Sequence, residues 1–129
     1  MKVGLLGLES HGLRERSIAL DILHALTRQH GHEVVFNLDA AFDDRALIWG
    51  TVETQQMDLL AVSLRASSGT LLPRLKSALQ QRQSNGLKLP KLVFGGTTAL
   101  ASPDKIREIF PDSTVCTSDA EAVFPEILS

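Results

Sequence analysis

The stretch from Lys2 to Arg14, KVGLLGLESHGLR, decides the fold of this chain. Its first part, Lys2 to Leu8, is an almost continuous apolar block, which is typical of a β-strand buried on both faces of a parallel sheet. A carboxylate, a hydroxyl and an imidazole follow directly, in Glu9, Ser10 and His11. Turns between a buried strand and a helix are where α/β proteins place their chemistry, so this turn is the first candidate site.

Four more apolar blocks follow, and longer segments with helical patterning separate them. The predicted strands after the first are Glu33 to Leu38, Asp58 to Leu64, Lys91 to Phe94 and Thr114 to Thr117. The predicted helices are Leu13 to His30, Asp43 to Gln56, Leu71 to Gln83, Pro103 to Phe110, and a fifth that Ser118 or Asp119 caps and that ends at Leu128. Strict alternation of strand and helix predicts an α/β fold, a three-layer α/β/α sandwich around a parallel sheet. With five strands, we expect the flavodoxin-like, Rossmann-like order 2-1-3-4-5, in one domain over residues 1–129.

Three details of the helices can be checked. The first helix has an apolar face of Ile18, Ile22, Leu23 and Leu26. The second has a less regular inner face, made by Ala46, Leu47, Trp49, Gly50 and Val52. Pro125 should kink or shorten the last helix unless that helix starts late.

Composition sets limits on the function. Apolar residues make up 43% and charged residues 22% of the 129, as in an ordinary globular domain. The net charge of −2 gives no electrostatic footprint for nucleic acid or an anionic membrane, and no apolar run reaches the length that spans a bilayer. A single cysteine, Cys116, cannot form an internal disulfide, and the start of the chain lacks the pattern of a signal peptide. We therefore expect a cytoplasmic protein, and a homo-oligomer stays open.

Ligands of such sheets bind beyond the carboxyl ends of the strands, where the strand order reverses, here between strands one and three. The loops that we expect at this edge are Glu9 to Gly12, Arg65 to Gly69, Gly95 to Thr98 and Ser118 to Glu121. Several familiar sites are excluded, because the chain has no G-x-G-x-x-G after strand one, no Walker loop, no Gly-x-Ser-x-Gly elbow and no phosphoacceptor aspartate at the end of strand three. With only Ser10 as a hydroxyl after strand one, a flavin phosphate loop is not favoured.

Two glycines, Gly95 and Gly96, follow strand four. A pair of glycines at a strand end lets a bulky ligand approach the backbone, and it equally suits a tight turn. The hydroxyls around Ser67 could contact a ligand or only cap the third helix. Both interpretations stay open at each place.

Taken together, three segments resemble the cobalamin-binding domain, a family of flavodoxin-like topology. They are Glu9-Ser10-His11, Ser63-Leu64 and Val93-Phe94-Gly95-Gly96, against the family's D-x-H-x-x-G, S-x-L and Gly-Gly. The resemblance implies cobalamin as cofactor, His11 as the lower axial ligand of cobalt, and Glu9 as the acid that orients it. It also implies cofactor contacts from Glu9, Ser10, His11, Gly12, Ser63, Leu64, Arg65, Ser67, Gly95, Gly96, Thr97, Ser118 and Glu121.

The sequence departs from the family pattern at several places. Glu9 replaces the aspartate, Leu64 comes one residue early, and Arg14 stands where the motif has glycine and could obstruct the channel for the nucleotide tail. The C-terminal part, from Phe94 to Leu128, is similar to cobalamin domains that precede radical SAM domains, which often lack the axial histidine. Because Cys116 is alone, an iron–sulfur cluster for such chemistry would belong to another polypeptide.

The resemblance implies a corrinoid-binding module that presents its cofactor to a separate catalytic subunit, of mutase, methyl-transfer or radical SAM type, and that does not turn over substrate alone. One rival is a cofactor-free regulatory or scaffold protein, which Arg14 favours. Another is a small α/β enzyme that acts on an acidic metabolite with His11 as base, Glu9 as orienter and Arg65 as anion clamp. Arg65 could also pair with a phosphate, with a propionamide or with Glu9.

Five other side chains have interpretations that need no ligand. We expect His24, His30 and His32 at the surface or at helix ends, and Trp49 in the core or an interface. Cys116 should be an inert buried thiol.

Overall fold

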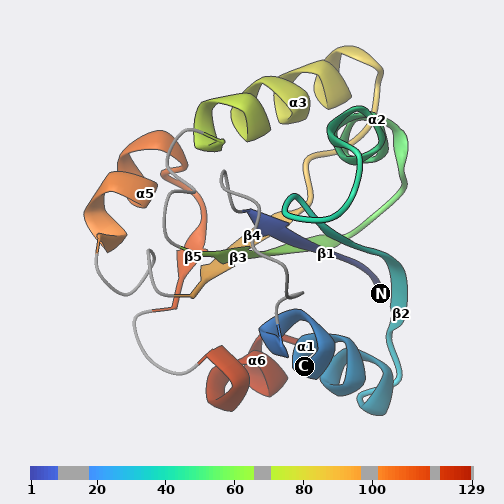
Figure 1. Ribbon diagram of the computed structural model, residues 1–129, viewed down its shortest axis with the longest axis vertical. Helices are drawn as coiled ribbons and strands as arrows, with labels where there is room; N and C mark the ends of the chain where they lie inside the picture. The colour runs from blue at the N-terminus through green and yellow to red at the C-terminus, as the bar shows by residue number, and fades with distance from the viewer. Residues whose placement is uncertain (9–17, 66–70, 97–101, 117–119, 129) are drawn as a thin grey trace.

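A computed structural model of the chain describes residues 1–8, 18–65, 71–96, 102–116 and 120–128. Strands and helices alternate along the chain, as Figure 1 shows. The strands are β1 (Lys2–Leu8), β2 (Glu33–Asp39), β3 (Leu59–Leu64), β4 (Lys91–Gly95) and β5 (Thr114–Val115). The helices are α1 (Ile18–Gln29), α2 (Arg45–Thr54), α3 (Leu72–Ser84), α5 (Pro103–Ile109) and α6 (Ala120–Leu128).

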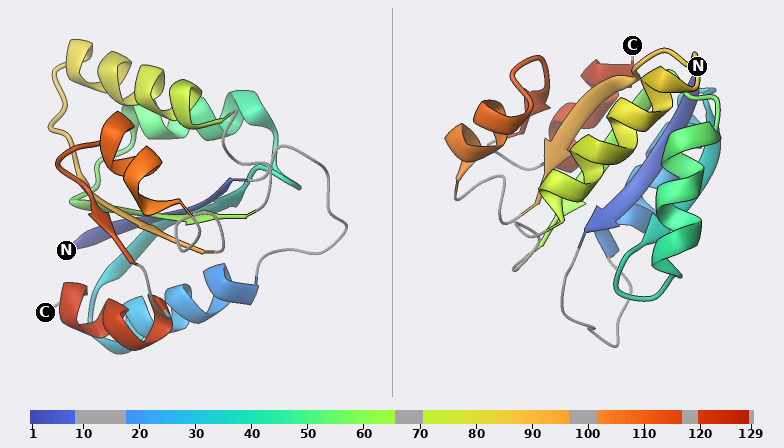
Figure 2. Two further views of the ribbon diagram at one scale, coloured as in Figure 1. Left: turned by 90° about the vertical axis from the view of Figure 1, so that its left-hand side faces the viewer. Right: turned by 90° about the horizontal axis from the view of Figure 1, so that it is seen from above.

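All five strands form one parallel sheet in the order β2-β1-β3-β4-β5. The predicted fold and strand order are therefore confirmed. Right-handed crossovers place helices on both sides of a parallel sheet, and the two views of Figure 2 show the sheet between two helical layers. The strand order reverses between β1 and β3, so the carboxyl ends of these two strands lie at the switch point.

Two apolar clusters fill the spaces between the layers. Helices α2, α3 and α5 cover one face of the sheet, and this larger cluster holds Trp49, Leu64 and Phe94. Helices α1 and α6 cover the other face, where Leu20 and Phe124 are buried. The core position of Trp49 and the burial of Cys116 are as predicted.

Helix α2 shows one error of the sequence analysis. Its buried residues are Ile48, Trp49 and Val52, whereas Leu47 is 55% exposed and Ala46 is also exposed. The inner face predicted from Ala46 and Leu47 is therefore wrong. Helix geometry explains the difference, because residues two apart, such as Leu47 and Trp49, are about 200° apart around the helix and cannot share one face. The helix starts after Asp44, whose carboxylate accepts a hydrogen bond from the backbone N–H of Leu47 at 3.1 Å.

The ends of the elements differ modestly from prediction. Strands β2 and β4 each extend one residue further, to Asp39 and Gly95, while β5 keeps only Thr114–Val115 of its predicted four residues. Helix α6 starts at Ala120 and continues through Pro125 to Leu128, so it is not shortened at the proline. Within the described ranges, no helix has both the length and the apolar character needed to cross a membrane.

Candidate functional site

A row of small residues crosses the sheet near the carboxyl ends of its central strands. Gly7 of β1 pairs in register with Ser63 of β3, and Ser63 pairs with Gly95 of β4. Side chains alternate between the faces of a strand, and Ala61 and Val93 belong to the cluster under α1 and α6, so Ser63 and Gly95 face the same side. A Cβ built on Gly7 would lie 2.9 Å from Leu20 Cδ1 of α1, which places Gly7 on that side too.

The hydroxyl of Ser63 is the polar group of this row. Ser63 is only 5% exposed, and among the described residues no hydrogen bond engages its hydroxyl. Ser63 Oγ does not count among the described side-chain atoms that are fully buried and lack a partner, so the hydroxyl keeps access to solvent. The row therefore offers an accessible hydroxyl, which can donate or accept a hydrogen bond, between two glycines.

An ion pair lies beside this row. Arg65 follows β3, and its Nη2 donates hydrogen bonds to both carboxylate oxygens of Asp39, at 3.0 Å and 2.9 Å. Asp39 ends β2 and its side chain is fully buried, while that of Arg65 is 19% exposed. The backbone N–H of Ala41 also donates to Asp39 Oδ1 at 3.0 Å, so the carboxylate is held from two directions.

The ion pair spans the end of β1, because β1 lies between β2 and β3 in the sheet. A Cβ on Gly7 would lie 3.1 Å from Asp39 Cγ, so the glycine leaves room for the carboxylate. The backbone N–H of Arg65 donates to the carbonyl of Leu8 at 3.3 Å, which fixes the start of its loop against β1. The structure therefore places an arginine–carboxylate ion pair at the switch point.

Asp39 is a functional candidate that the sequence analysis missed. The crevice was assigned to the loops that follow strands one, three, four and five, and the segment after strand two was not considered. The signal was available, since a carboxylate directly ends an apolar strand at the edge where Arg65 was expected. Among the described residues, Asp39 is a carboxylate partner of Arg65, and Glu9, the protein partner that was predicted, lies outside them.

Gly96 has a structural reason of its own. Its φ is +99°, and a Cβ would lie 2.3 Å from the carbonyl oxygen of Leu64, a distance that real Cβ atoms do not reach. The close turn against β3 thus requires glycine here without any ligand. Gly95, by contrast, is an ordinary strand residue of β4 that is buried in the row.

The remaining predicted residues divide into two groups. The side chain of Leu64 is fully buried in the cluster under α2, α3 and α5, on the face opposite Ser63. Glu121 lies in the first turn of α6, and only its backbone is described. The other predicted contacts lie outside the described residues: Glu9, Ser10, His11, Gly12, Ser67, Thr97 and Ser118. Arg14 lies outside them as well.

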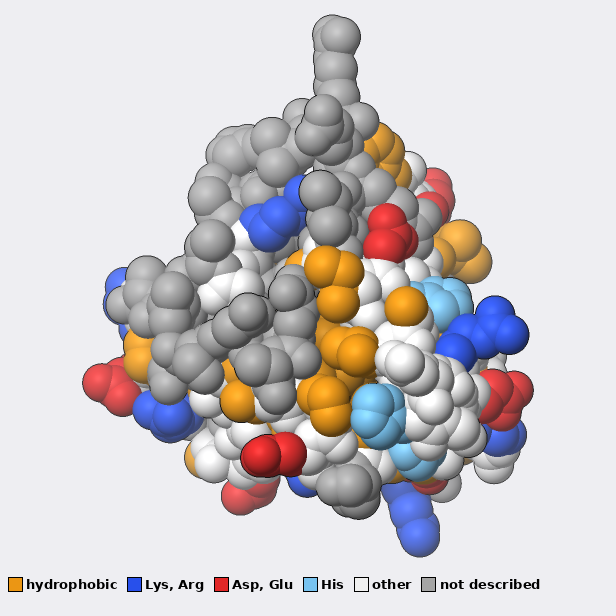
Figure 3. Space-filling model, turned by 90° about the horizontal axis from the view of Figure 1, so that it is seen from below, with side chains coloured by type: hydrophobic (Ala, Val, Ile, Leu, Met, Phe, Trp, Pro, Cys, Tyr) orange, Lys and Arg blue, Asp and Glu red, His pale blue; other side chains and the backbone are white. Residues whose placement is uncertain are grey.

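His30, His32 and Cys116 lie as predicted, whereas His24 is half-buried in the middle of α1 and not at the surface or a helix end. Figure 3 shows the face formed by α1 and α6, where hydrophobic side chains gather with histidine side chains beside them. His30 is exposed at the end of α1, His32 follows in the turn to β2, and His24 is half-buried with Asn37 Nδ2 3.0 Å from its Nδ1. Burial raises the pKa of the Cys116 thiol, which keeps it protonated. Within the described ranges, no group of three or more histidine, cysteine and acidic side chains is placed to hold a metal ion.

Comparisons with known proteins agree with the fold. No protein-family model matches this sequence, and no curated protein sequence matches it. The chain is similar to two solved structures of the cobalamin-dependent S-adenosylmethionine radical enzyme OxsB, one with aqua-cobalamin and S-adenosylmethionine bound and one with aqua-cobalamin bound. For each, the TM-score is 0.80 at 16% identity, over 98% of this chain. The chain spans 18% of the length of that enzyme chain.

Proposed function

We propose that this chain is a corrinoid-binding module that holds cobalamin over the carboxyl ends of its strands and presents it to a separate catalytic domain or subunit. The observation that carries the proposal is the row of Gly7, Ser63 and Gly95, whose hydroxyl has no hydrogen-bond partner among the described residues. The resemblance of the sequence to cobalamin-binding domains supports it. So does the likeness of the fold to OxsB, whose structures contain aqua-cobalamin.

The described residues fit a neutral ligand bordered by amides. The Ser63 hydroxyl can donate to or accept from an amide or a ribose oxygen, and the glycines on either side leave space for it. Because Asp39 supplies a counter-charge, Arg65 is not an isolated cation, and its surroundings suit an uncharged ligand better than an anion. This weighs against the anion clamp of the small-enzyme alternative.

The loops that follow the strands would supply the rest of the site. In this proposal His11 would ligate cobalt and Glu9 would orient its imidazole, while contacts to the cofactor would come from Ser10, Gly12, Ser67, Thr97, Ser118 and Glu121. When bound, cobalamin supplies cobalt-centred radical or methyl-transfer chemistry. The substrate pocket would lie on the catalytic partner.

Retention of cobalamin by the purified protein tests the proposal directly. Hydroxocobalamin is added to the full chain, unbound cofactor is removed by desalting, and the visible spectrum is recorded. We expect the corrin absorbance to elute with the protein at a stoichiometry near one. Protein that elutes colourless at every cofactor concentration would contradict the proposal.

Two variants of Ser63 test whether the row contacts the cofactor. Ser63→Ala keeps the space and removes the hydroxyl, and we expect a loss of affinity of about tenfold, in line with one buried hydrogen bond. Ser63→Leu fills the space and should abolish retention. Ser77→Leu on the exposed face of α3 is the matched control and should retain cobalamin as the parent does. If Ser63→Leu still binds normally, the cofactor does not occupy the row.

His11→Ala separates binding from axial ligation. If the imidazole ligates cobalt, the variant should retain colour with a shifted visible spectrum, because the axial ligand changes. An unchanged spectrum would mean that cobalamin binds without this histidine as ligand.

A cofactor-free regulatory or scaffold protein is the second candidate, and the ion pair of Arg65 with Asp39 favours it. This salt bridge crosses the end of β1, so the chain's own side chains satisfy polar groups at the switch point without a ligand. Arg65→Ala distinguishes the candidates when cobalamin affinity is measured. If Arg65 contacts the cofactor, the affinity falls, whereas if Arg65 obstructs the site, the affinity rises from an undetectable level.

A further inference from the structure

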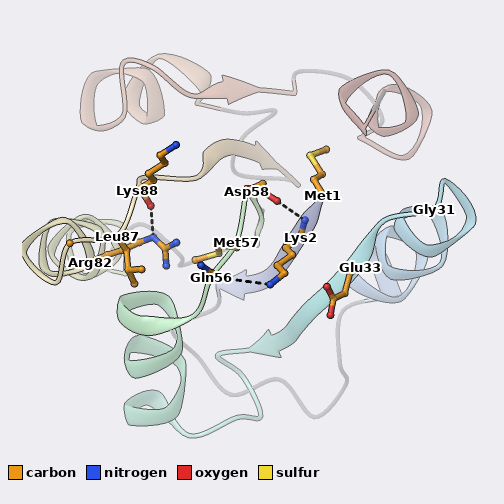
Figure 4. Close-up of a pocket in the computed structure, with 11 residues that line it drawn as sticks. Met1, Lys2, Gly31, Glu33, Gln56, Met57, Asp58, Arg82, Leu87 and Lys88 are labelled. Atoms are coloured by element: carbon orange, nitrogen blue, oxygen red, sulfur yellow. Dashed lines mark hydrogen bonds between the residues drawn. The ribbon is translucent and has the colours of Figure 1, made fainter.

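A pocket lies at the amino ends of the strands, on the opposite side of the sheet from the carboxyl ends that hold Ser63 and Arg65. Its volume is about 710 Å³, and it is lined by the start of β1, the turn between α1 and β2, the segment before β3, and the end of α3 with the turn that follows it. Figure 4 shows the lining side chains around this hollow. The proposed corrinoid site does not use any of them.

Arg82 of α3 is the buried charge of this pocket. Only 1% of the residue is exposed, yet within the described part of the chain it has no carboxylate partner. Its Nε donates to the carbonyl of Lys88 at 2.7 Å, and its Nη1 donates to the carbonyls of Val52, at 3.3 Å, and Gln55. These carbonyls fix the guanidinium plane, and Figure 4 shows the group between Leu87 and Met57 at the pocket.

One terminal nitrogen of the guanidinium is left over. Among the described residues, no hydrogen bond engages Nη2 of Arg82, so both of its N–H donors are available to a ligand. A buried cation is costly unless it is paired, and neutral carbonyls compensate it only partly. The burial also lowers the pKa of Arg82, which is the direction expected for a cation short of counter-charge.

The other charges of the pocket leave an excess of positive charge. Three cationic side chains line it, Lys2, Arg82 and Lys88, against two carboxylates, Glu33 and Asp58. Asp58 is already engaged, because its Oδ2 accepts a hydrogen bond from the backbone N–H of Lys2 at 2.7 Å. Figure 4 shows Lys2 and Asp58 on one side of the hollow and Lys88 on the other.

We propose that this amino-end pocket is a binding site for an oxyanion of the phosphate type, free or carried by a small metabolite, with Arg82 Nη2 as its central donor. Lys2 and Lys88 would approach the anion from the two sides of the pocket, since Lys side chains bind phosphate as mobile point charges. The volume of about 710 Å³ exceeds what one phosphate needs and leaves room for an attached carbon skeleton.

The test is a titration of the isotope-labelled full chain with inorganic phosphate, followed by backbone amide shifts at constant ionic strength. We expect saturable shifts that are confined to the amides of residues 31, 56–58 and 86–88. Glycerol 3-phosphate is the second probe: tighter binding than phosphate identifies a phosphorylated metabolite as the source, and equal binding identifies the free ion. Shifts that grow linearly, or that spread over the lysines of the whole surface, would overturn the proposal.

Variants assign the effect to the pocket. Lys88→Gln should weaken phosphate binding by about tenfold, and the double variant of Lys2→Gln with Lys88→Gln should weaken it further, since each loses one charge-assisted contact. Arg107→Gln, an exposed arginine on α5, is the control and should bind as the parent does. Arg82→Gln should abolish binding. If that variant does not fold, the double lysine variant decides, and an unchanged affinity in it would overturn the proposal.

Discussion

The two edges of the sheet each contain a buried or nearly buried arginine, and the two are compensated in different ways. At the carboxyl edge, Arg65 is 19% exposed and pairs with the fully buried carboxylate of Asp39. At the amino edge, Arg82 is 1% exposed, and its hydrogen bonds to described residues all go to backbone carbonyls. Within the described part of the chain, the first arginine thus has a carboxylate as counter-charge and the second has none.

The difference indicates which ligand each edge can accept. A neutral pair can donate hydrogen bonds to an uncharged ligand but does not attract an anion, while an uncompensated guanidinium favours an anion over a neutral group. The carbonyls of Val52 and Gln55 also lie at the C-terminal end of α2, where the helix dipole favours a cation, so Arg82 stabilises the fold as well as the pocket. These contrasts predict different losses of unfolding free energy when residues at the two edges are mutated.

Loss of Arg82 should have the largest effect on stability. Arg82→Met leaves the carbonyls of Val52, Gln55 and Lys88 without their donor in a buried place, and we expect the free energy of unfolding to fall by about 4 kcal/mol. Urea unfolding followed by circular dichroism measures it. Arg107→Met on the exposed surface of α5 is the control and should unfold at the parent's midpoint. Equal midpoints for the two variants would mean that Arg82 does not hold the amino edge together.

The glycines of the two edges give the next largest contrast. Gly96 and Gly86 both have positive φ, +99° and +85°, but a Cβ on Gly96 meets the Leu64 carbonyl oxygen at 2.3 Å, while Gly86 has open space. We expect Gly96→Ala to cost about 3 kcal/mol, since it adds a clash to the conformational strain, and Gly86→Ala only about 1 kcal/mol, from strain alone. Thermal unfolding of both variants without any ligand makes the comparison. Similar losses of stability in the two variants would show that the turn after β4 can relax around the added methyl group. The close approach to Leu64 would then not explain why a glycine stands at Gly96.

Removal of the carboxylate should cost less than removal of Arg82. Asp39→Asn keeps the shape of the side chain but removes the carboxylate charge that faces the guanidinium of Arg65. We expect the free energy of unfolding to fall by about 2 kcal/mol. The loss should be smaller than for a fully buried pair, because the Arg65 side chain is 19% exposed. Urea unfolding of Asp39→Asn beside Asp104→Asn, whose carboxylate is almost fully exposed, measures the difference. A loss no larger than that of the exposed control would show that Arg65 finds water or another acceptor as readily as Asp39.

Much of the fold could be predicted from the sequence, because strands buried on both faces give continuous apolar blocks and their helices give a 3.6-residue pattern. The block Lys2 to Leu8 matches β1 residue for residue, and the strand order was correct. The inner face of α2 was wrong because Leu47 and Trp49 are two residues apart, which separates them by about 200° around a helix, so they cannot face the core together.

The site was predicted less completely than the fold, for a different reason. Ser63 and Gly95 were predicted as cofactor contacts because their segments resemble motifs of the cobalamin-binding domain, and the structure pairs the two residues across β3 and β4. Asp39 was missed because a contact with Arg65 joins residues 26 apart in the chain, and no local pattern reports it. Arg82 was missed because an arginine in the last turn of a helix is usually solvated, and only the tertiary structure shows that it is buried.

Ionisation of Cys116 should have the smallest effect on the free energy of unfolding, and it reports whether water reaches the carboxyl ends of the strands. Cys116 follows β5, its backbone N–H donates to Phe94 O at 2.8 Å, and burial raises the pKa of its thiol. A folded pKa above the unfolded value of about 8.5 means that the neutral thiol stabilises the fold fully at lower pH. That contribution is lost as the pH rises through the folded pKa, because the unfolded state then ionises first. We expect the parent to lose more free energy of unfolding than Cys116→Ala does between pH 7 and pH 9.5, as measured in urea. Equal losses of unfolding free energy in the parent and in Cys116→Ala would mean that water reaches the thiol in the folded protein. The desolvated region at the carboxyl ends of the strands would then include Asp39 but not Cys116.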